Sequence, residues 1–185
     1  MNSSQLLIVV IVVAVIAVAI IAYAAMRKRR SRHLRERFGP EYERVVRSEG
    51  DVRKGEGVLE FREKRREKLK IRPLSPTDRS SFLYRWNEVQ SRFVDDPNGA
   101  VTLADSLVTD VMQARGYPIG EFEQRAADVS VDHPLVVDNY RAAREIAVRH
   151  SRGEASTEDL RKAMVHYRSL FEDLLDQHQP QRKGA

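Results

Sequence analysis

The sequence contains no cysteine, which excludes a disulfide scaffold, a thiol nucleophile and a cysteine-type zinc site. It also lacks a Walker-type glycine loop, a Gly-x-Gly-x-x-Gly motif and a Gly-x-Ser-x-Gly motif. The five histidines show neither His-Glu-x-x-His nor Glu-x-x-His spacing. We therefore expect no metal site and no cofactor, and no motif indicates an enzyme.

Charge is absent from residues 6–26, an unbroken run of 21 residues of which thirteen are Leu, Ile or Val. As a helix this run would be roughly 32 Å long, compared with a hydrocarbon core of about 30 Å. We predict a transmembrane helix here. A cleaved signal peptide is the alternative, supported by Ala22, Ala24 and Ala25, but residues 1–5 contain no basic residue and the run is long for a signal peptide.

Basic residues follow the apolar run closely and none precedes it. The positive-inside rule then predicts residues 1–5 outside the membrane and residues 27–185 in the cytoplasm. The first basic residues are also expected to contact anionic lipids, at about 1 kcal/mol each near the surface. These residues are Arg27, Lys28, Arg29, Arg30 and Arg32.

A charge boundary near residue 72 divides the rest of the chain. Residues 27–72 carry a net charge of +9 and residues 73–185 a net charge of −4. We interpret 27–72 as a basic, partly helical connector, interrupted at Gly39-Pro40 and then helical from Glu41 to Lys70. Because apolar residues are few and glycines interrupt this helix, a flexible tether is the favoured description.

Residues 73–175 are predicted to form a bundle of about four amphipathic helices, so the fold class is all-α. No segment alternates with a period of two, and we predict no sheet. The four helices are expected to follow caps at Ser75, Asp96, Ser130 or Asp132, and Ser156. We also predict a short helical segment at 120–128, and we expect residues 176–185 to be a disordered tail.

Three polar residues next to predicted helix starts form a candidate site. Asp96, Asp132 and His133 would form a polar cluster if both loops met at one end of the bundle, although capping alone explains the aspartates. Tyr84 and Tyr117 lie off the apolar stripes and are predicted to belong to an interaction surface.

The order of several landmarks resembles a family of uncharacterised bacterial proteins, commonly described as hypothetical or membrane proteins. The resemblance covers roughly residues 31–175 and implies a bacterial source, hence an inner-membrane location, but it implies no activity. The landmarks are Arg37–Tyr42, Arg72–Ser75, Phe93–Pro97, Arg115–Pro118, Ser130–Pro134 and Ser156–Leu175.

Three functions are compatible with these features. The favoured hypothesis is a membrane-tethered scaffold that binds an unidentified protein at the cytoplasmic face. The second is binding of anionic lipid or, less favoured, nucleic acid through the basic connector, particularly residues 53–72. The third is an enzyme that uses the Asp96, Asp132 and His133 end of the bundle.

Overall fold

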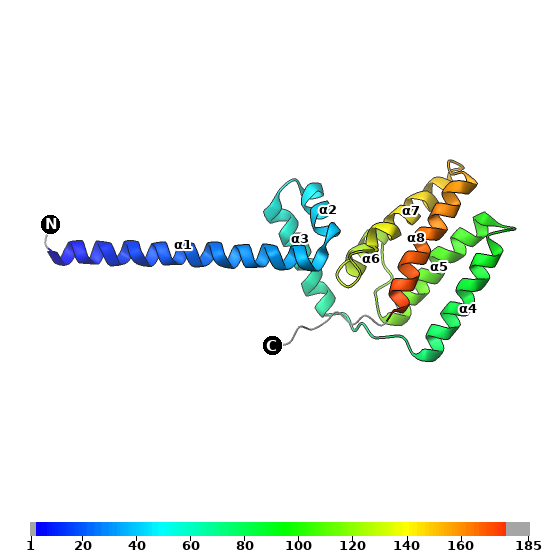
Figure 1. Cartoon of the computed structure of the whole chain (residues 1–185), viewed down its shortest axis with the longest axis horizontal. Helices are drawn as coiled ribbons and strands as arrows, with labels where there is room; N and C mark the ends of the chain where they lie inside the picture. Colours follow the sequence, from blue (N-terminus) through cyan, green and yellow to red (C-terminus); the bar gives the residue numbers. More distant parts are fainter. Residues whose placement is uncertain (1–2, 177–185) are drawn as a thin grey trace.

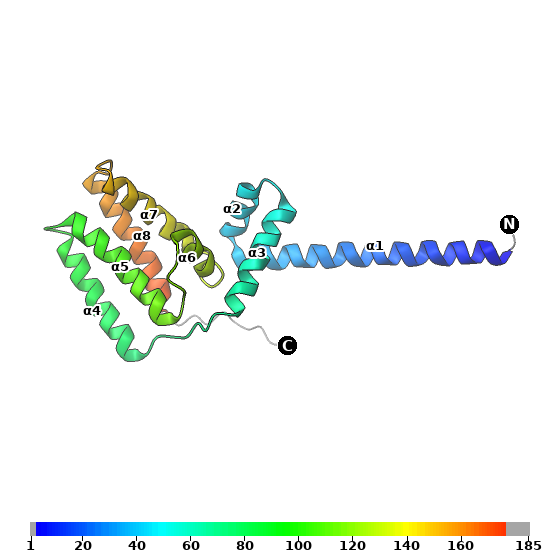
Figure 2. The ribbon, with the colours of Figure 1, turned by 180° about the vertical axis from the view of Figure 1, so that it is seen from behind.

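The computed structural model describes residues 3–176, with side chains from residue 11 onward. This part of the chain contains eight α-helices and no strand, as expected for an all-α fold. One long helix projects from a group of shorter ones (Figures 1 and 2). The helices are α1 (Ser3–Phe38), α2 (Pro40–Glu49), α3 (Val52–Glu67), α4 (Pro76–Arg92), α5 (Pro97–Arg115), α6 (Phe122–Val129), α7 (Val137–Ser151) and α8 (Thr157–Leu175).

Helix α1 includes one segment that is long and apolar enough to cross a membrane. Residues 11–26 are all exposed, so this apolar segment is not the core helix of the folded part. The helix continues without a break through the basic residues to Phe38. Leu34 and Phe38, in its last turns, are 1% and 0% exposed. One continuous helix therefore connects the exposed apolar segment to the buried side chains of Leu34 and Phe38.

The connector folds into a helical hairpin against the end of α1. Gly39, with a φ of 47°, turns the chain between α1 and α2, at the predicted interruption. The prediction of one helix from Glu41 to Lys70 is wrong, because Gly50 ends α2 in the left-handed region and Asp51 caps α3. The N-terminal cluster consists of Leu34, Phe38, Tyr42, Val45, Leu59 and Val131.

Local capping accounts for three of the four predicted helix starts in the C-terminal helices, α4–α8. The side chains of Ser75, Asp96 and Ser156 each accept a hydrogen bond from the amide three residues later. Helix α7 differs, because it begins only at Val137, without a side-chain cap. Residues 130–136 instead form turns, which leaves Asp132 available for other partners.

The C-terminal helices share a second hydrophobic core. Helices α5 and α8 pack together, α7 lies along α8, and α4 lies along α5. The Trp86 ring of α4 stacks on Phe171 of α8, with 4.7 Å between the ring centroids. Helix α6 contacts both α3 and α7, so it lies where the hairpin meets the C-terminal helices (Figure 1).

The segment between α3 and α4 crosses the end of α5. The Arg72 amide donates to the Arg115 carbonyl at 2.9 Å. Gly116, with a φ of 94°, ends α5 at this crossing, and a Cβ there would lie 2.5 Å from the Lys70 carbonyl oxygen. Only glycine combines this backbone conformation with so close an approach.

Candidate functional site

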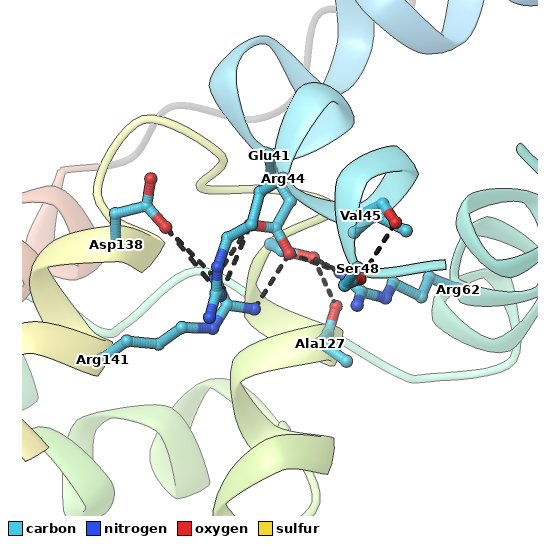
Figure 3. Close-up of polar contacts among 9 residues, drawn as sticks. Glu41, Arg44, Val45, Ser48, Arg62, Ala127, Asp138 and Arg141 are labelled. Carbon is cyan, nitrogen blue, oxygen red and sulfur yellow. Dashed lines mark hydrogen bonds and ion pairs between the residues drawn. The ribbon is translucent and has the colours of Figure 1, made fainter. Parts of the chain in front are cut away.

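The hairpin and the C-terminal helices meet around a buried carboxylate. Glu41 lies in the first turn of α2, and its side chain is 0% exposed. Arg62 of α3 donates to its Oε1 at 2.6 Å. Arg141 of α7 donates to Oε2 at 2.8 Å and to Oε1 at 2.9 Å. Glu41 thus lies between arginines from two different parts of the fold (Figure 3).

The charges around Glu41 determine its protonation state. Burial alone would raise the pKa of this carboxyl, but hydrogen bonds and positive charges from Arg141 and Arg62 outweigh burial and lower it. Glu41 is therefore ionised under ordinary conditions, and both of its oxygens are already engaged. It is fully buried and acts as a structural anion between the two arginines.

Two further arginines of α3 extend the same interface. Arg65 donates to Asp128 of α6 at 2.8 Å, and Arg66 donates to Asp132 at 2.6 Å. The aspartate side chains are 1% and 2% exposed. The positive hairpin is thus paired with buried acidic residues of the C-terminal helices. We call the contacts of Glu41, Arg62, Arg65, Arg66, Asp128, Asp132 and Arg141 the junction network.

The structure brings Asp132 and His133 together with Tyr117. The Tyr117 hydroxyl donates to Asp132 at 2.8 Å, and burial together with the Asp132 charge raises the pKa of the tyrosine. His133, 4% exposed, contacts Asp173 through Nδ1 and Arg115 through Nε2. These groups lie at the C-terminal end of α5, against the hairpin.

Asp96 does not join this group. It caps the opposite end of α5 and pairs with Arg92. The 19 residues of α5, roughly 28 Å of helix, lie between Asp96 and the end of α5 where Tyr117 and Asp132 are found. Asp96 is therefore a helix cap, and the predicted three-residue polar cluster is divided between two ends of the fold.

The two predicted surface tyrosines differ. Tyr84 is 66% exposed and remains available for contact, whereas Tyr117 is only 3% exposed. Tyr117 belongs to the interior because its hydroxyl finds Asp132 as an internal acceptor. The prediction of Tyr117 as part of an interaction surface is corrected accordingly.

The basic residues after the apolar segment lie on the surface of α1. Arg30 pairs with Glu60 of α3. Arg27, Lys28, Arg29 and Arg32 pair with no carboxylate among the residues that the structure describes. Within that part of the chain, no group of three histidine, aspartate or glutamate side chains is arranged to hold a metal ion.

An apolar groove lies between α4 and α8. Its volume is about 150 Å³, and Trp86, Phe93, Met164 and Val165 supply its apolar lining. Val165 is 54% exposed, so the groove opens to solvent on the α8 side. Arg161 and Arg168 flank it.

Of the junction network, sequence reasoning singled out only Asp132, as part of a candidate polar cluster. Glu41, Arg62 and Arg141 carry no local motif, and Glu41 and Arg141 are 100 residues apart. The available signal was the opposite net charge of the two halves, which is compatible with one packing on the other. Comparison with protein-family models, curated proteins and solved structures finds no match.

Proposed function

We propose that this chain is a single-pass inner-membrane protein with its N-terminus outside and its C-terminal helices in the cytoplasm. In this proposal the C-terminal helices form a bundle that binds a partner protein next to the membrane. The protein is thus a membrane-tethered scaffold.

The observation that carries the proposal is the continuity of α1. Its exposed apolar segment has no place in the folded part, and its last turns are buried in the N-terminal cluster. Burying Leu34 and Phe38 contributes about 1.5–3 kcal/mol each, which favours a fixed connection. An anchor of this kind holds the bundle at a defined height and orientation.

The α4–α8 groove is the surface that best fits a partner. Its apolar lining and open side suit the apolar face of an amphipathic helix, which inserts side chains at helical spacing. Tyr84 lies two residues from Trp86 on α4, so it projects from roughly the opposite side of that helix and lies outside the groove.

Membrane insertion and orientation are tested first. After alkaline extraction of membranes, the full chain should remain in the pellet. With Lys162→Cys introduced into the cysteine-free sequence, a membrane-impermeant maleimide should label only after the cytoplasmic side is exposed. Release by alkali, or labelling of intact cells, contradicts the proposal.

Partner binding is tested with a photo-crosslinking residue at position 165 of the full chain in its membrane. We expect one discrete crosslinked partner. Leu135, an apolar residue that is 75% exposed and lies near Gly39, is the matched control position and should give none. Equal crosslinking at both positions would contradict binding through the groove.

The nucleic-acid and enzyme hypotheses remain predictions with less support. Arg62, Arg65 and Arg66 of the basic segment pair with acidic residues of this same chain, which leaves fewer charges for a phosphate backbone. For the enzyme hypothesis, Asp96 lies far from Asp132 and His133, and both of the latter are buried.

A further inference from the structure

A basic cleft lies where the apolar segment of α1 ends. One side is formed by α1 from Tyr23 to Glu36, and the other by the first turn of α3 at Val52 and Glu56. Its volume is about 570 Å³. A second cavity of about 380 Å³ continues round α1 and shares Tyr23, Arg27 and Glu56 with the first.

The lining of this cleft changes from apolar to basic along α1. Tyr23 and Ala24 belong to the apolar run, and Arg27, Lys28, Arg32 and Arg35 follow. Glu36 and Glu56 are the carboxylates that line it, and Glu56 already accepts a hydrogen bond from Tyr42 at 2.8 Å. Basic side chains therefore outnumber acidic ones, and the cleft favours an anion.

The basic part of the cleft from Arg27 to Arg32 matches the headgroup layer of one leaflet in depth. Arg27 to Arg32 covers about 8 Å of helix axis, and the headgroup layer of a leaflet is about 5–8 Å thick. If the apolar run spans the hydrocarbon, Arg27, Lys28 and Arg32 lie at headgroup depth, and Arg35 and Glu36 lie beyond it. Val52, 43% exposed, would then face the bilayer surface from the α2–α3 turn.

We propose that this cleft binds the headgroup of an acidic phospholipid. The phosphate would interact with Arg27, Lys28 and Arg32, while the glycerol and upper acyl chains lie along Tyr23 and Ala24. A free phosphate ion has no apolar part that could contact Tyr23 and Ala24, whereas a phospholipid does. This difference favours the lipid as the occupant. The inference rests on the proposed membrane anchor.

The test is native mass spectrometry of the full chain in a neutral detergent. Phosphatidylglycerol should bind at least about tenfold more tightly than phosphatidylcholine, because only the former has net negative charge. Arg32→Gln should weaken phosphatidylglycerol binding by about tenfold. Lys54→Gln is the matched control, since Lys54 is an exposed basic residue beside the cleft that lines neither cavity, and it should change binding less than twofold.

Three outcomes would overturn the inference. They are equal binding of the two lipids, equal loss in the two variants, and displacement of the lipid by water-soluble glycerol phosphate at the same concentration. The last would identify a site for a free phosphate group. Alkaline extraction distinguishes this inference from the proposed function. If alkali releases the chain from membranes, the proposed membrane anchor is wrong. If the chain stays in the membrane but shows no lipid preference, only this inference is wrong.

Discussion

At the scale of single residues, Glu41 is the buried carboxylate that joins α3 to α7. Its carboxylate offsets two arginines that are themselves only 15% and 11% exposed. A buried ion pair contributes little net free energy to folding when both partners are present. Removal of one partner is costly, because the other charge is then buried without a counter-charge. Replacing one carboxylate oxygen of Glu41 by an amide nitrogen should therefore have a large effect on folding stability.

Glu41→Gln should destabilise the fold by about 3 kcal/mol, because Arg62 and Arg141 lose their shared negative charge. The measurement is urea unfolding of the detergent-solubilised full chain, followed by circular dichroism. Glu172→Gln is the matched control, because the Arg168–Glu172 pair is more than half exposed on both sides and should contribute less than about 0.5 kcal/mol. Equal effects would show that the junction network does not stabilise the fold.

The stabilisation from Glu41 should also depend on pH. Its pKa in the folded chain lies below the ordinary 4.5, so the ionised carboxylate favours folding. The stability advantage of the native chain over Glu41→Gln should be constant above about pH 5 and should shrink as the pH falls through the depressed pKa. Unfolding free energies of both chains across this range provide the measurement, and an advantage that grows in acid contradicts the assignment.

Residue roles were predictable from sequence where the interaction is local. Ser75, Asp96 and Ser156 cap amides only three residues away, so each cap is visible in a short window. Asp132 has the same local appearance but bonds to Arg66 and Tyr117, 66 and 15 residues away. No short window distinguishes these cases, because the distant partner is brought close only by the fold.

At the scale of helices, the α2–α3 hairpin depends on close backbone approach. A Cβ at Gly55 would lie 2.8 Å from the Cα of Val46, so the glycine lets α3 lie directly against α2. Sequence reasoning treats Gly55 and Gly57 alike as weak points in a solvated helix. Their surroundings in the fold differ, because a Cβ at Gly57 would have no atom within 4 Å.

The paired substitutions Gly55→Ala and Gly57→Ala should therefore have opposite signs. Gly57→Ala should stabilise the chain by about 1 kcal/mol, because alanine restricts the unfolded chain and favours helix. Gly55→Ala should destabilise it by about 1–3 kcal/mol, because the added methyl group pushes α2 away. Urea unfolding of both variants provides the measurement, and stabilisation by both would mean that the hairpin is not closely packed.

At the scale of the whole molecule, the all-helical class was predictable, but the division of the connector into α2 and α3 and the arrangement of the helices were not. Amphipathic spacing and caps are properties of each segment, whereas the position of the hairpin depends on pairs such as Arg65–Asp128. Sequence reasoning favours a flexible tether because the connector has few apolar residues. Charge pairing with the C-terminal helices supplies the contacts that its composition lacks.

If the connection is rigid, the distance between α1 and the C-terminal helices should vary little. Because the sequence contains no cysteine, spin labels can be attached at Arg29→Cys and Lys162→Cys without further changes. Pulsed electron spin resonance should give a distance distribution as narrow as that between labels at Tyr84→Cys and Lys162→Cys. Glu41→Gln should broaden the first distribution and leave the second unchanged, because only the first pair spans the junction network. A broad first distribution in the native chain would instead support the flexible tether, and the proposed fixed orientation of the bundle at the membrane would then be wrong.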